Sequence, residues 1–83
     1  MSNQYSVEID CGPGMVRPNT YFDNMCNTCG LDPIWFDVPS TCFGCWEWKI
    51  KPEYEDSYKA KYQLVETFLT KLYKSGAIRY ASF

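Results

Sequence analysis

Four cysteines in two close pairs are the residues of this chain best suited to chemistry. Cys26 and Cys29 are separated by two residues, and after twelve intervening residues Cys42 and Cys45 repeat that spacing. Four thiolates in this pattern are what a tetrahedral Zn²⁺ ion requires, since each short gap brings two sulfur atoms within reach of one ion. Because the ligand set is complete, we expect a closed, structural zinc site without an open catalytic position.

The full pattern, C-x2-C-x12-C-x2-C, resembles the zinc knuckles of the zinc-ribbon and treble-clef families. The resemblance covers residues 26–45. Gly30 and Gly44 stand where a knuckle needs a tight turn that directs backbone N–H groups at the sulfur atoms. The resemblance implies Zn²⁺ as the cofactor and leaves the activity open.

Two other uses of the same cysteines are considered. Disulfides would suit a small secreted domain, but residues 1–5 carry neither a basic start nor an apolar run. We therefore expect a cytoplasmic protein whose thiols stay reduced. A rubredoxin-like iron site uses similar pairs, yet the second pair lacks the proline and trailing glycine usual in that family. The fifth cysteine, Cys11, is expected to be a small buried residue, with an exchangeable ligand or an oxidation-sensitive thiol as the alternative.

The composition argues against catalysis. The chain of 83 residues contains no histidine, the commonest general base, and shows neither a glycine-rich phosphate loop nor an H-E-x-x-H motif. No apolar run approaches the ~20 residues that cross a membrane. A chain of this length has a small core, for which a metal ion is a common support. We expect a protein that is neither an enzyme nor a membrane protein.

Alternating apolar and polar residues predict strands on both sides of the cysteines. Residues 5–9 alternate with period two, and residues 15–22 read as an edge strand or loop interrupted at Pro18. Residues 34–38 and 46–50 are expected to form a hairpin with a knuckle at its end.

Residues 52–75 have the signals of one long amphipathic helix. Pro52 suits the first helical position, acidic residues follow it, and Gly76 suits a left-handed position after the end. Its apolar stripe is expected to pack on the chain's own sheet: Tyr58, Tyr62, Val65, Leu69 and Leu72. Because the helix is longer than a small ribbon can cover, the excess is expected to meet a partner or a second copy in a homodimer.

The expected fold class is therefore α+β, a small zinc-stabilised β-hairpin or ribbon followed by one long amphipathic C-terminal helix. The chain is interpreted as a single domain over residues 1–83. Its expected parts are N-terminal strands (1–25), the zinc-knuckle hairpin (26–51), the helix (52–75) and a C-terminal tail or strand (76–83).

Charge is divided unevenly between the two halves of the chain. Residues 1–45 contain five acidic residues against Arg17 alone, a formal charge of −4, whereas residues 46–83 carry +2. Zinc modules that grip phosphates normally place Lys or Arg beside their knuckles, so the acidic knuckle region disfavours nucleic acid as the partner.

Aromatic residues are more numerous than so small a core should need, at fifteen of 83. We expect some of them to contact a protein partner on the hairpin. The candidate contact residues are Trp35, Phe36, Asp37, Trp46 and Trp48. Trp35 is expected to be the most exposed aromatic, because alternation places its neighbours Ile34 and Phe36 on the other face. The alternative is that Trp35 packs under residues 15–22.

These features favour a non-enzymatic, zinc-binding protein-interaction module. Compact acidic chains of this style resemble small accessory proteins of phages, which implies an inhibitor or modulator of a nucleic-acid-processing complex in the host cytoplasm. The alternative is a nucleic-acid-binding zinc-ribbon regulator whose cations contact phosphates. Those cations would be Lys59, Lys61, Lys71, Lys74 and Arg79. A continuous basic stripe would favour this alternative, and scattered lysines would favour the protein-interaction module.

Overall fold

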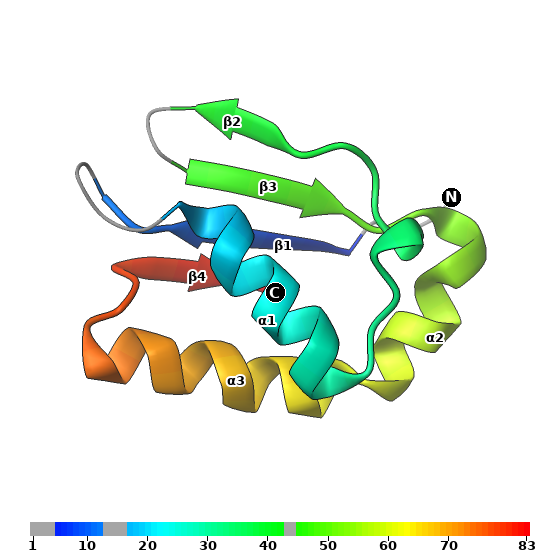
Figure 1. Cartoon of the computed structure of the whole chain (residues 1–83). Helices are drawn as coiled ribbons and strands as arrows, with labels where there is room; N and C mark the ends of the chain where they lie inside the picture. Colours follow the sequence, from blue (N-terminus) through cyan, green and yellow to red (C-terminus); the bar gives the residue numbers. More distant parts are fainter. Residues whose placement is uncertain (1–4, 13–16, 43–44) are drawn as a thin grey trace.

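The computed structural model of the chain consists of a four-stranded antiparallel sheet with helices packed against it (Figure 1). It describes residues 5–12, 17–42 and 45–83, with Cys42 described by its backbone alone. The strands are β1 (Ser6–Asp10), β2 (Ser40–Cys42), β3 (Cys45–Lys49) and β4 (Tyr80–Ser82), in the sheet order β2-β3-β1-β4. The helices are α1 (Pro18–Cys29), α2 (Glu55–Ala60) and α3 (Tyr62–Ser75), with 3₁₀ turns η1 (Pro33–Trp35) and η2 (Pro52–Tyr54).

The predicted α+β class is confirmed. One helical connection joins β1 to β2 and a second joins β3 to β4, so the chain follows a βαββαβ order. With an antiparallel sheet in which β1 and β3 are central, this is the split βαβ arrangement. Across the described ranges, no helix is long and apolar enough to span a membrane.

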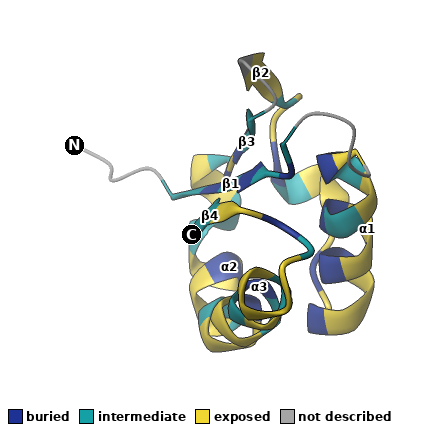
Figure 2. Ribbon diagram, turned by 90° about the vertical axis from the view of Figure 1, so that its left-hand side faces the viewer, coloured by how far each residue is buried: buried dark blue, intermediate teal, exposed yellow. Residues whose placement is uncertain are grey.

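The two central strands bury one face of the sheet. Strand β1 confirms the strand predicted near residues 5–9, and its residues Val7 and Ile9 are fully buried. Val7 pairs with Trp48, which is 4 % exposed, and Ile9 pairs with Trp46. Alternation turns Glu8 and Glu47 to the opposite face, which we call the open face. The buried positions of the described strands, dark blue in Figure 2, lie in β1 and β3, and alternation places all of them on one face of the sheet.

Helix α1 replaces the strand or loop expected at residues 15–22, of which residues 15 and 16 lie outside the described residues. The helix begins at Pro18, whose fixed φ suits the first helical position, and Gly30 ends it with a φ of 75°. Phe22 stacks on Trp48 with ring centroids 4.3 Å apart and packs edge-on against Phe36 at 4.9 Å. The strand prediction was wrong because Pro18 was taken as a strand breaker.

The hairpin expected from residues 34–38 and 46–50 is present in altered form. Phe36 forms an isolated antiparallel bridge with Ile50, and β2 begins only at Ser40. Residues 33–35 form a 3₁₀ turn, in which the Asp32 carboxylate accepts a hydrogen bond of 3.1 Å from the Ile34 N–H. The turn removes the expected alternation, so Ile34 is 58 % exposed.

The helix predicted over residues 52–75 is divided into η2, α2 and α3. The break lies at Lys61, whose φ of −106° and ψ of 4° leave the α-helical region. The predicted apolar stripe is nevertheless core, since Tyr58, Val65 and Leu69 are fully buried. Gly76 caps α3 with a φ of 82°, as expected, and residues 80–82 form a strand, one of the two states expected for residues 76–83. A homodimer through this helix stays a prediction.

The aromatic stack between α1 and β3 is expected to dominate stability. Trp48→Ala should lower the free energy of unfolding by ~3–5 kcal/mol, because it empties a closely packed core position. Val38→Ala is the control, since Val38 is 89 % exposed and its loss should cost no more than ~0.5 kcal/mol. Urea denaturation of both variants measures the difference, and equal effects would contradict the assigned core.

Candidate functional sites: the cysteine pairs and the open sheet face

The first cysteine pair lies at the C-terminal end of helix α1. Cys26 and Cys29 are 4 % and 3 % exposed and share the buried face of the helix, because residues three apart lie on one side. The Cys26 carbonyl accepts hydrogen bonds from the N–H groups of Gly30 and Leu31, the latter at 2.9 Å. The structure therefore places these two predicted ligands on the same face of α1, at its C-terminal end.

Both thiols of this pair are held in the protonated form when no metal is bound. Burial, with smaller contributions from Asp23, Cys29 and Asp32, raises the pKa of Cys26 from the ordinary 9.0 to about 12. Burial also raises the pKa of Cys29, although Lys61 acts in the opposite direction. Protonated thiols are weak nucleophiles, and both metal binding and nucleophilic chemistry require the thiolate.

The second predicted pair is only partly described. Cys45 is half-buried at the start of β3 and lies opposite Asp10 of β1. By strand alternation it shares the open face with Glu47, whereas Cys26 and Cys29 belong to the core on the helix side. The side chain of Cys42 lies outside the described residues, as does Gly44.

The described part of the chain contains no group of three or more Cys, Asp or Glu side chains that could hold a metal ion. For one ion to bind both cysteine pairs, the thiol of Cys45 at the start of β3 would have to point towards α1. Two of the four predicted thiol ligands, Cys26 and Cys29, thus lie on one helix face. The four-cysteine zinc site stays a prediction.

Cys11 agrees with its expected role as a small buried residue. It is 4 % exposed and belongs to the hydrophobic core. Burial and the neighbouring Asp10 carboxylate raise its pKa.

The predicted partner-contact residues fall into two groups. Phe36 and Trp48 are 6 % and 4 % exposed, so they pack the core and offer little surface to a partner. Asp37 is exposed, while Trp46 is half-buried. Trp35 is also half-buried and stacks on Tyr54 with ring centroids 6.3 Å apart. A contact role for Trp35, Asp37 and Trp46 stays a prediction.

The expectation that Trp35 is the most exposed aromatic is wrong. Among the described residues, the most exposed aromatic side chains are Tyr73 and Tyr80, at 56 % and 49 %. Trp35 lies in the 3₁₀ turn η1 rather than in a strand, and the turn lays its ring on Tyr54.

A pair of carboxylates at the centre of the open face was not anticipated. Glu8 of β1 lies directly opposite Glu47 of β3. The Ile50 N–H donates to the Tyr5 carbonyl at 2.9 Å, so alternation makes Glu8 and Glu47 a non-hydrogen-bonded pair. Side chains approach most closely in such pairs. Alternation placed both residues on outward positions, but the sequence does not show that they are cross-strand neighbours.

Neither glutamate forms an ion pair with a described residue, although Lys49 shares their face of the sheet. Ser82 lies beside Glu8, and Ser40 lies beside Glu47. The single ion pair recorded between described residues joins Arg79 Nε to Asp10 Oδ2 at 3.3 Å. The two glutamates therefore stand as unpaired like charges in the middle of a partly exposed surface.

No protein-family model, no curated protein and no solved structure matches this chain.

The zinc prediction is tested by elemental analysis of protein purified under reducing conditions. One Zn²⁺ per chain is expected, contributing on the order of 10 kcal/mol of apparent binding free energy that the fold shares. Cys26→Ser and Cys42→Ser should each release the ion. Cys11→Ser should retain it, because that residue is a core side chain outside the predicted ligand set. Metal-free wild-type protein that remains folded would contradict the prediction.

The metal-free chain should lose stability at alkaline pH. Burial raises the pKa of Cys26 and Cys29, so the folded chain keeps protons that the unfolded chain releases. The free energy of unfolding should be level below the ordinary thiol pKa of 9.0 and fall as the pH rises from there towards about 12. Urea denaturation with chelator and reductant measures this fall, which Cys26→Ala should reduce. A free energy of unfolding that increases over the same range would show that the thiols ionise more readily when folded.

Proposed function

We propose that this chain is a non-enzymatic protein-interaction module that binds a basic protein surface through the open face of its sheet. The observation that carries the proposal is the Glu8–Glu47 pair at the centre of that face. Like charges directly opposite each other on neighbouring strands destabilise a sheet, by ~0.2–1 kcal/mol on the usual scale of cross-strand pairs. A lysine or arginine of a partner, placed between the Glu8 and Glu47 carboxylates, would attract both of them. The repulsion between the two glutamates therefore favours the bound state.

The thiols support a role other than catalysis. The chain contains no histidine. In the metal-free chain, burial raises the pKa values of Cys11, Cys26 and Cys29, so these thiols stay protonated near neutral pH. Cysteine chemistry needs the thiolate, which these three residues supply only under alkaline conditions.

The outward positions of the central strands disfavour nucleic acid. Four-stranded sheets that bind single-stranded RNA stack its bases on aromatic side chains of the sheet. Here the central strands present mainly small, acidic and thiol side chains on the open face, with Lys49 as their one cation. These residues are Ser6, Glu8, Asp10, Cys45, Glu47 and Lys49. An acidic surface of this kind is suited to a basic groove that would otherwise hold nucleic acid.

The cations of the C-terminal half lie in separate surroundings, which supports the same interpretation. Lys59 lies over the Tyr5 ring with its Nζ 5.5 Å from the ring centroid. Lys71 lines a hollow between α1 and α3, and Arg79 pairs with Asp10 at the β1–β4 side. This distribution favours scattered cations over a phosphate-binding stripe.

Within this proposal the chain acts as an inhibitor or modulator of a host nucleic-acid-processing complex, of the kind that phages encode. Zinc, where Cys26, Cys29, Cys42 and Cys45 hold it, has a structural role. The nucleic-acid-binding regulator remains the alternative, and the binding experiment below separates the two.

Neutralising the carboxylate pair should weaken partner binding without harming the fold. In the double variant Glu8→Gln/Glu47→Gln, recovery of the partner should fall by about tenfold or more, the scale of an interfacial charge pair. Its free energy of unfolding should rise by ~0.2–1 kcal/mol, because a like-charge contact is removed. Affinity purification from the native host with quantitative mass spectrometry, together with urea denaturation, measures both effects.

The matched control is Glu53→Gln/Asp56→Asn, which removes the same charge from exposed positions on η2 and α2. Equal loss of partner in the two double variants would show that net charge, and not the open face, governs binding. A duplex or single-stranded DNA titration with submicromolar affinity and a steep salt dependence would favour the alternative function.

A further inference from the structure

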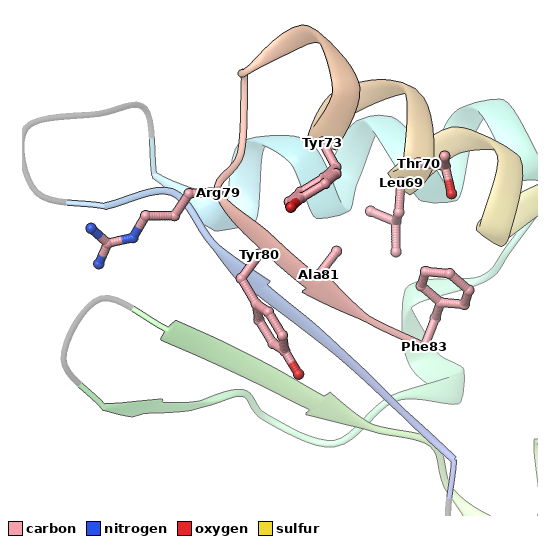
Figure 3. A pocket seen from close by; sticks show the side chains of 7 residues that line it. All are labelled: Leu69, Thr70, Tyr73, Arg79, Tyr80, Ala81 and Phe83. Atoms are coloured by element: carbon pink, nitrogen blue, oxygen red, sulfur yellow. The ribbon is translucent and has the colours of Figure 1, made fainter.

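A second surface of the chain lies between helix α3 and the edge strand β4. It is a hollow of about 320 Å³, within the size range of ligand pockets. Helix α3 contributes Leu69 and Tyr73, and the β4 side contributes Tyr80, Ala81 and Phe83. Figure 3 shows Leu69, Tyr73, Ala81 and Phe83 around one space, with Arg79 directed away from it at the start of the strand.

The backbone along this hollow has unused hydrogen-bonding capacity. Strand β4 pairs with β1 on one side and is the last strand of the sheet on the other. Alternation along β1 turns the N–H and C=O groups of Glu8 and Asp10 towards β4, and the Asp10 carbonyl accepts from the Arg79 N–H at 2.9 Å. Tyr80 and Ser82 lie opposite these residues, so the N–H and C=O of Ala81 point to the outer edge. In the described part of the chain, no backbone hydrogen bond outside the strand ladders involves Ala81.

The side chains beside this edge are apolar and unusually exposed. Tyr73 is 56 % exposed and stands over a floor made by Leu69 and Ala81, whereas the ring of Tyr80, which is 49 % exposed, points to the other side of β4 (Figure 3). An extended segment laid along β4 would direct alternate side chains towards this floor, where an apolar residue would lose contact with water.

The charge at the start of the strand favours an acidic ligand. Arg79 is 59 % exposed at its side chain and uses Nε for its bond to Asp10. Its other guanidinium N–H groups have no recorded partner within the described residues, so they can donate charge-assisted hydrogen bonds to a carboxylate.

We propose that the groove between α3 and β4 binds an extended peptide as an additional strand beside Ala81. The peptide places an apolar side chain against Leu69 and Tyr73 and an acidic side chain near Arg79. Main-chain pairing supplies the affinity of such a complex, and the pocket and the charge supply its specificity. This groove and the open face accept opposite charges, so the proposal stands independently of the proposed function.

The test is a selection of short random linear peptides displayed on phage against the immobilised wild-type chain. The enriched sequences are then synthesised with a fluorescent label and titrated by anisotropy. Enriched peptides should share an apolar residue and an acidic residue at a fixed spacing. Ala81→Pro should weaken their binding by at least about tenfold, because proline removes the outward N–H while sparing the ladder to β1. N-methylation of the peptide backbone at the pairing position should have the same effect without altering the protein.

Two further variants keep the result interpretable. Tyr73→Ser removes an exposed wall of the pocket and should weaken binding, whereas Leu64→Ser changes an exposed residue of α3 outside this groove and should not. No enrichment, or enriched peptides that bind Ala81→Pro and Tyr73→Ser as tightly as wild type, would overturn the proposal. Sedimentation equilibrium supplies a further outcome, since a wild-type dimer that Ala81→Pro dissociates would mean that a second copy, not a peptide, occupies the groove.

Discussion

The antiparallel register between β1 and β3 is the constraint on which the rest of the structure depends. It places Val7 opposite Trp48 and Ile9 opposite Trp46, so that the two central strands present one apolar face. A shift of one residue in the pairing register would expose the apolar side chains of one of these strands to solvent. The aromatic stack of Phe22 on Trp48 then fixes where α1 lies, and the buried residues of α3 complete the core.

The same register creates the surface assigned to partner binding. Once the apolar residues face the helices, Glu8 and Glu47 must meet on the other side of the sheet. The core and the charged face are therefore two consequences of one pairing. The groove beside β4 has a different origin, because it lies between the last strand of the sheet and helix α3.

The sequence alone predicted those elements whose structure is determined by a local pattern of residues. Period-two alternation located β1 and the inward positions of β3, and the left-handed position of Gly76 ended α3 as expected. Helix α1 was missed because two of its core positions, Cys26 and Cys29, were assigned to a metal site. Phe22, Met25, Cys26 and Cys29 have the spacing of a buried helical stripe once thiols are counted as apolar residues. The Glu8–Glu47 pair was beyond local reasoning, since 39 positions of chain separate two residues that only the register brings together.

The central claim is tested most directly by the proton nuclear Overhauser effects of the folded chain. In a non-hydrogen-bonded antiparallel pair the two Cα atoms are only ~4.5 Å apart, so their Hα protons give a strong cross-peak. The account predicts such a cross-peak between the Hα protons of Glu8 and Glu47. A cross-peak from Glu8 to Trp46 or Trp48 in its place would mean a shifted register, and it would contradict both the assigned core and the acidic open face.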